Sequence, residues 1–246
     1  MTTSDTTASD VGAGSKAAGH RPLGPTEYAR FIDHTLLRPE ATRAEVADAL
    51  ADAVELGVHS VCVAPVHLPL DVPLRPDGTK AVKVTTVVGF PSGAHKTSVK
   101  VAEATQAVAD GADELDMVVN LTDVKNGDYA SVKNEISDLK RIAGDHILKV
   151  IIETCYLTDD EKIELCHAIT DAGADYIKTS TGFGTAGATM EDVRLFRENI
   201  GPGVKIKAAG GIRTREDMEA YIEAGCSRLG TSSAISILAE GVAQGY

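Results

Sequence analysis

The sequence predicts a single-domain α/β protein whose eight βα units close into a (β/α)8 barrel. Two observations support this fold class. First, an amphipathic helical pattern, a glycine, a short polar step and an apolar strand recur at Gly57, Gly111, Gly173 and Gly225. These glycines lie 54, 62 and 52 residues apart, and a βα unit takes about 30 residues, so each interval holds two units. Second, eight strand-like runs can be placed in order. A doubly wound open sheet is the alternative.

The elements follow one another regularly along the chain. Each recurring glycine suits the left-handed residue that ends a helix, so strands are expected just after them, at 60–65, 114–120, 176–180 and 228–232. The other four strands are expected in the β-branched and apolar runs between them, at 31–35, 83–89, 148–154 and 205–209. A helical pattern is expected after each strand.

The first residues differ from the rest of the chain. Residues 1–24 are rich in Thr, Ser, Ala and Gly and show no apolar periodicity, which predicts a flexible tail. No second linker interrupts the remainder, so residues 25–246 are expected to form one barrel domain. A dispensable extension without a function is the simplest interpretation of this tail.

Composition limits the classes of partner. The 246 residues carry a formal net charge of -12, and no basic run is present that could neutralise phosphates, so neither nucleic acid nor a membrane surface is an expected partner. No apolar stretch is long enough to span a membrane, and no signal-peptide pattern begins the chain. Reduced thiols in a cytoplasmic protein are expected, because the four cysteines are widely spaced. The scattered histidines show no metal-ligand spacing.

Two lysines, Lys178 and Lys207, occur in runs typical of buried parallel strands. Lysine is rarely buried unless it is paired or used chemically. Side chains alternate along a strand, so if the apolar faces of the fourth to seventh strands meet the helices, the polar faces point inward. That arrangement brings Asp116, Lys149, Lys178 and Lys207 into one interior. An internal salt-bridge network without chemical use is the alternative.

Adjacent lysines suggest amine chemistry. Desolvation and a neighbouring ammonium group both lower the pKa of a lysine, and a neutral lysine is the nucleophile of Schiff-base enzymes. Lys178 and Lys207 lie on neighbouring predicted strands and meet this requirement. Asp116 and Lys149 add a carboxylate and a further cation, which are enough for a proton relay.

Small residues at the ends of the last three strands suggest an anion site. Ser180-Thr181-Gly182, Gly210-Gly211 and Ser232-Ser233 would expose backbone N–H groups, which bind phosphate. Barrels often bind phosphate after the seventh and eighth strands. Tight turns and a helix cap are the alternative.

Six motifs resemble the deoxyribose-phosphate aldolases, a family of class I aldolases, and the resemblance runs in order from about Tyr28 to the C-terminus. They are IDHTLL (32–37), SVCVAP (60–65), GADELDMVVN (111–120), LKVIIET (148–154), YIKTSTGF (176–183) and IKAAGGIRT (206–214). The resemblance implies reversible cleavage of the phosphosugar 2-deoxy-D-ribose 5-phosphate to acetaldehyde and D-glyceraldehyde 3-phosphate, with no metal and no cofactor. A barrel isomerase or synthase without an imine and a non-catalytic phosphosugar sensor are the competing hypotheses.

The resemblance also implies roles for single residues. Lys178 matches the Schiff-base former, Lys207 the lysine that perturbs it and shares proton transfer, and Asp116 the acid/base carboxylate. Lys149 matches a lysine that supports this carboxylate, while Asp33 and Cys62 match residues of the substrate pocket. The matches to the phosphate site are Gly182, Gly210, Gly211, Ser232 and Ser233. The last residue, Tyr246, matches a tyrosine that assists proton transfer, and a homodimer is a possible assembly.

Overall fold

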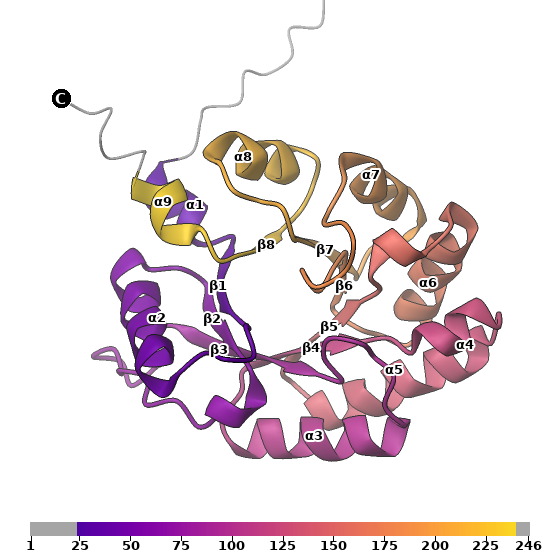
Figure 1. Ribbon diagram of the computed structural model, residues 1–246, viewed down its shortest axis with the longest axis horizontal. Coiled ribbons are helices and arrows are strands. Elements are labelled where there is room, and N and C mark those ends of the chain that lie inside the picture. Colours follow the sequence, from indigo (N-terminus) through magenta and orange to yellow (C-terminus); the bar gives the residue numbers. More distant parts are fainter. Residues whose placement is uncertain (1–23, 240–246) are drawn as a thin grey trace, which may run out of the picture.

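The protein forms a closed barrel of eight parallel strands in a computed structural model that describes residues 24–239 (Figure 1). The strands are β1 (Ile32–Leu36), β2 (Ser60–Val63), β3 (Lys83–Val88), β4 (Glu114–Val118), β5 (Ile147–Ile151), β6 (Tyr176–Lys178), β7 (Lys205–Ala209) and β8 (Arg228–Thr231). β1 pairs with both β2 and β8, which closes the barrel and excludes the open sheet. The predicted fold class is therefore confirmed, and all eight predicted strands are present.

Helices surround the barrel on the outside (Figure 1). The longer ones are α2 (Arg43–Leu56), α3 (Thr97–Ala109), α5 (Tyr129–Ala143), α6 (Asp159–Asp171), α7 (Met190–Asn199) and α8 (Arg215–Glu223). Shorter helical segments are α1 (Pro25–Ala29), α4 (Leu121–Lys125), α9 (Ala234–Ala239) and the 3-10 turns η1 (Pro65–His67) and η2 (Thr154–Tyr156). The recurring glycines have positive φ values of 64° to 109° where helices end, as predicted.

One expected helix does not form. The segment between β2 and β3 contains only the turn η1 and an isolated bridge between Leu74 and Lys80. Four prolines occupy positions 65, 69, 73 and 76, and proline removes a backbone donor and clashes with the preceding helical turn. The expectation of a helix after every strand is thus wrong after β2.

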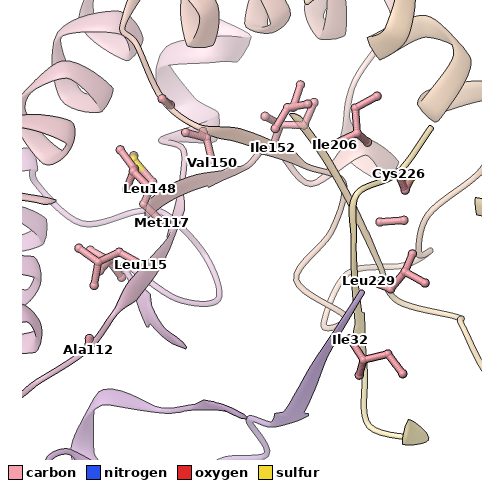
Figure 2. Close-up of a cluster of buried hydrophobic side chains, with 14 of the residues drawn as sticks. Ile32, Ala112, Leu115, Met117, Leu148, Val150, Ile152, Ile206, Cys226 and Leu229 are labelled. Carbon is pink, nitrogen blue, oxygen red and sulfur yellow. The ribbon is translucent and has the colours of Figure 1, made fainter. Parts of the chain in front are cut away.

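The apolar faces of the strands meet the helices. Figure 2 shows Leu115, Met117, Leu148 and Val150 projecting from β4 and β5 toward the surrounding helices, and all four are fully buried. The opposite face of the same strands carries charged side chains into the barrel. A barrel interior is usually filled by layers of Val, Ile and Leu, so this interior is built differently.

Two predictions fall on the ends of the chain. The expected tail, residues 1–24, lies almost wholly outside the described residues, and Tyr246 lies outside them too. Between residues 24 and 239, no helix has the length and apolar character needed to cross a membrane.

Candidate active site

Strand register brings the four predicted charged residues together. Asp116 on β4 is the direct neighbour of Lys149 on β5, and Lys178 on β6 is the direct neighbour of Lys207 on β7. None of the four side chains is more than 5% exposed. The prediction of one shared interior is therefore confirmed in position.

Asp116 lies at the centre of this group. Its Oδ2 accepts hydrogen bonds from Lys178 Nζ at 2.7 Å and from Lys207 Nζ at 2.8 Å, while its Oδ1 accepts one from Lys149 Nζ at 2.7 Å. Because one oxygen atom contacts both Nζ atoms, the separation of Lys178 and Lys207 cannot exceed the sum of these two distances. The two amines are close enough to influence each other's ionisation.

A second layer of charges lies deeper in the barrel. Asp33 accepts from Lys207 Nζ and, at 2.8 Å, from Arg228 Nη1, which also donates to Glu114 Oε2 at 2.9 Å. Lys149 Nζ lies 2.6 Å from Glu114 Oε2. Sequence reasoning missed Glu114 and Arg228 as site residues. Glu114 could have been found, since it lies two positions before Asp116 on the same face of β4.

The charges of this cluster do not cancel if every group is ionised. Within the described part of the chain, the cluster comprises three carboxylates and four basic side chains: Asp33, Glu114 and Asp116, with Lys149, Lys178, Lys207 and Arg228. An uncompensated buried charge is strongly unfavourable. The cluster becomes neutral when one of the four basic groups gives up its proton, and lysine does so far more readily than arginine.

The pKa directions identify which lysine that is. Burial lowers the pKa of Lys178, and the positive charge of Lys207 lowers it further against the opposing pull of Asp116. Burial also lowers the pKa of Lys207 and that of Lys149. The negative charges of Asp116 and Asp33 outweigh this effect, so the pKa of each of these two lysines is raised. Lys178 is therefore the amine that most readily becomes a neutral nucleophile.

The carboxylates stay ionised at this site. Burial alone would raise the pKa of Asp116, but Lys149, Lys178 and Lys207 together hold it well below its usual value. The same balance lowers the pKa of Glu114 to about 2, with Lys149 as its main partner. His59 Nε2 contacts Glu114 Oε1 at 2.8 Å from the other end of the barrel. These carboxylates act as acceptors and fixed negative charges.

Cys62, predicted to line the pocket, lies on β2 beside this cluster and is fully buried. Burial raises the pKa of its thiol to about 11, and the negative charge of Asp116 acts in the same direction. The side chain is accordingly a neutral thiol rather than a reactive thiolate.

A cavity of about 520 Å³ opens next to Lys178 at the carboxyl ends of the strands. Its lining includes Lys178 and all five predicted phosphate residues, Gly182, Gly210, Gly211, Ser232 and Ser233. Gly210 and Gly211 have φ values of 82° and 85°, a backbone conformation that favours glycine. The structure adds Arg38 and Arg213 to the lining, two cations that sequence reasoning missed.

A larger cavity of about 830 Å³ lies outside the barrel, between α2 and the segment that follows η1. None of the predicted site residues lines this larger cavity. The candidate site is therefore assigned from the charged cluster and not from the size of a cavity. Among residues 24–239, no group of three or more His, Cys, Asp or Glu side chains is arranged to hold a metal ion.

Fold and site together define a (β/α)8-barrel enzyme whose site is centred on a buried lysine. The chain belongs to the DeoC/LacD family of aldolases, whose sequence profile matches residues 28–245. The resemblance inferred from the six motifs is confirmed.

Individual relatives agree with this family. The deoxyribose-phosphate aldolase of Clostridium botulinum (strain Eklund 17B / Type B) is 51% identical over 224 residues, which cover 91% of this chain and 100% of that protein. The solved structure of "QR15, an Aldolase" is 43% identical with a TM-score of 0.83, covering 89% of this chain and 97% of that one. A deoxyribose phosphate aldolase from Aeropyrum pernix, described as tetrameric, has 33% identity and a TM-score of 0.79, with 90% and 93% of the two chains covered.

Proposed function

We propose that this protein is a deoxyribose-phosphate aldolase, a carbon–carbon lyase that reversibly cleaves 2-deoxy-D-ribose 5-phosphate to acetaldehyde and D-glyceraldehyde 3-phosphate through a Schiff base. The observation that carries the proposal is the position of Lys178. Its amine has a lowered pKa, is hydrogen bonded to Asp116, and faces the cavity that the glycine and serine loops surround. The relatives named deoxyribose-phosphate aldolase support the choice of substrate.

The first chemical step belongs to Lys178. Its neutral Nζ adds to the aldehyde carbon of the open sugar, and loss of water leaves an iminium ion. The iminium accepts the electron pair of the bond between the second and third carbons, which breaks to give an enamine and releases D-glyceraldehyde 3-phosphate. Protonation of the enamine and addition of water then release acetaldehyde and restore the amine.

Proton transfer falls to Asp116 and Lys207. One group must take the proton of the third-carbon hydroxyl, and one must later protonate the enamine. Asp116 is an ionised acceptor and Lys207 a charged donor, and they are hydrogen bonded at 2.8 Å. A water molecule bound by both would carry the proton in each direction. Lys149 supports Asp116 through its hydrogen bond to Oδ1.

Substrate position depends on the cavity. We assign the phosphate to the backbone N–H groups and hydroxyls of Gly182, Gly210, Gly211, Ser232 and Ser233. Holding the phosphate fixes the distance from the aldehyde to Lys178 and so favours attack. Asp33 and Cys62 are fully buried and do not line this cavity, so their contact with substrate stays a prediction. A role for Tyr246 also stays a prediction, because that residue lies outside the described residues.

The remaining expectations complete the proposal. The barrel domain runs from residue 25 to residue 246, and the enzyme acts on phosphosugars and aldehydes in the degradation of deoxyribose phosphates. Cys62, Cys155, Cys166 and Cys226 are free thiols, which favours the cytoplasm. A homodimer stays a prediction that rests on the family resemblance alone.

Trapping with borohydride tests the imine. Reduction of a mixture of the enzyme and acetaldehyde should inactivate it irreversibly and leave a two-carbon adduct on Lys178, found by peptide mass spectrometry. Lys178→Leu should form no adduct and release no acetaldehyde from substrate, and treatment with EDTA should leave wild-type activity intact. Conversion of a phosphosugar without any adduct on Lys178 would favour an isomerase or synthase. Binding of the phosphosugar without conversion would favour a sensor.

A further inference from the structure

Glu153, two residues beyond the end of β5, has an unusual backbone conformation. Among residues 24–239 it is the one non-glycine residue with a positive φ, at φ 53° and ψ 68°, and its side chain is buried. Such conformations persist where the surrounding contacts enforce them, and they concentrate at functional sites. The contacts of Glu153 therefore indicate what the conformation is for.

The hydrogen bonds between β5 and β6 show a local kink at this residue. The N–H of Ile152 donates to the carbonyl of Lys178 at 3.1 Å, and the N–H of Thr154 donates to the carbonyl of Thr179 at 3.0 Å. Between these two hydrogen bonds the donors are two residues apart, at Ile152 and Thr154, whereas the acceptors are only one residue apart, at Lys178 and Thr179. A regular parallel ladder is evenly spaced, so Glu153 is an extra residue in the manner of a β-bulge. Bulges of this kind re-aim a side chain.

The re-aimed carboxylate binds the loop that follows Lys178. Both Oε atoms of Glu153 accept from the backbone N–H of Thr181 at 3.3 Å, and Oε2 also accepts from the Thr181 hydroxyl. The Thr181 Oγ1 in turn accepts from the N–H of Phe183 at 3.0 Å. This chain of hydrogen bonds fixes residues 181–183, and all three residues line the 520 Å³ cavity.

The same carboxylate constrains the far end of the loop. A Cβ atom added to Gly184 would lie 3.0 Å from Oε1 of Glu153 and 2.8 Å from Sγ of Cys155. The loop therefore lies directly against Glu153 at Gly184 as well as at Thr181. Between these two points lies Gly182, at φ 86°, one of the residues assigned to the phosphate.

We propose that Glu153 is a positioning residue that holds the loop 181–184 in the shape that binds the phosphate, and so sets the preference for phosphorylated over unphosphorylated deoxyribose. The proposal rests on the proposed function. The Glu153 carboxylate accepts three hydrogen bonds from Thr181 and one long contact of 4.0 Å from Cys155 Sγ, and none of the ion pairs described above includes it. It acts on the substrate through the loop and leaves the amine chemistry of Lys178 untouched.

Steady-state kinetics on two substrates tests this role. Thr181→Val, which removes the hydroxyl donor, and Glu153→Gln, which removes the charge, should each raise KM for 2-deoxy-D-ribose 5-phosphate by about tenfold. The value of kcat/KM for unphosphorylated 2-deoxy-D-ribose should change by less than about twofold, since its binding involves no phosphate. Thr181→Ser keeps the hydroxyl and should behave as the wild type.

Controls separate this proposal from its premise. Cys155→Ala, which removes only the weak 4.0 Å contact from Sγ to Glu153 and keeps the hydrogen bonds from Thr181, should leave both substrates unaffected. Borohydride trapping of acetaldehyde on Lys178 should persist in Thr181→Val and Glu153→Gln. Equal losses on both substrates, or no change on either, would overturn the positioning role. Failure of the wild type to cleave substrate or form the adduct would overturn the proposed function itself.

Discussion

At the scale of single residues, the two central lysines differ in ionisation although they share one carboxylate oxygen. Lys207 contacts two carboxylates, Asp116 and Asp33, whereas Lys178 contacts Asp116 alone. The second carboxylate keeps Lys207 charged, and that charge in turn disfavours a charge on Lys178. The number of carboxylate partners therefore decides which lysine becomes the nucleophile.

Removal of Lys207 and removal of Asp116 should move the pKa of Lys178 in opposite directions. Lys207→Met removes a cation that lowers this pKa, so the pKa should rise; Asp116→Asn removes an anion that raises it, so the pKa should fall. Both shifts should be measurable, because Asp116 is hydrogen bonded to Lys178 and Lys207 contacts the same oxygen of Asp116. The pH dependence of amine labelling at Lys178, followed by mass spectrometry, measures both shifts. Movement of both variants in the same direction would contradict the assignment.

At the scale of elements, one buried lysine serves packing and not chemistry. Lys100 on α3 is fully buried, pairs with Glu135 on α5 at 2.8 Å, and donates to the carbonyl of Val118 at the end of β4. A Cβ atom on Gly89 would lie 2.8 Å from its Cε atom, so the strand end also packs closely against it. The ion pair joins two helices to the strand that carries Asp116.

Replacing one partner of this ion pair should destabilise the fold more than replacing both. Lys100→Met leaves the Glu135 carboxylate buried without its cation and should lower the free energy of unfolding by about 3–5 kcal/mol. The double variant with Glu135→Leu should recover most of that loss. Urea denaturation measures both. Additive losses in the double variant would show that the two side chains act independently.

At the scale of the whole molecule, the barrel interior is a layer of ion pairs that extends from Lys178 to Arg228. Arg228 supplies the third permanent cation against the three carboxylates. Without it, a charged Lys178 would be needed to neutralise the cluster. A residue at the opposite end of the barrel from the cavity therefore influences the ionisation of the nucleophile.

Arg228→Met should accordingly raise the pKa of Lys178 and reduce activity near neutral pH. We expect kcat/KM at about pH 7 to fall about tenfold, with partial recovery at about pH 9, where Lys178 can lose its proton. Arg141→Met on the exposed face of α5 is the matched control and should have no effect. A uniform loss at both pH values would indicate misfolding or a different role for Arg228.

Much of this architecture could be predicted from the sequence because strands follow a strict period of two. That period placed Asp116, Lys149, Lys178 and Lys207 on one face, and the structure brings them together. It could not reveal Glu153, because the kink after β5 interrupts the alternation and depends on contacts with a distant loop. The four prolines between β2 and β3 are the sequence signal for the missing helix, because proline disfavours a helix more strongly than the regular βα repeat favours one.

The ionic interior described here constrains how the barrel can change. In an apolar core, Leu can replace Ile at one position with a small adjustment of its neighbours. In this core, loss of a carboxylate leaves a cation buried without its partner, and loss of a permanent cation is offset only when Lys178 takes up a proton and ceases to be a nucleophile. Viable sequences are therefore expected to exchange these residues in compensating pairs, so that an engineer who redesigns one layer must redesign its counterpart at the same time.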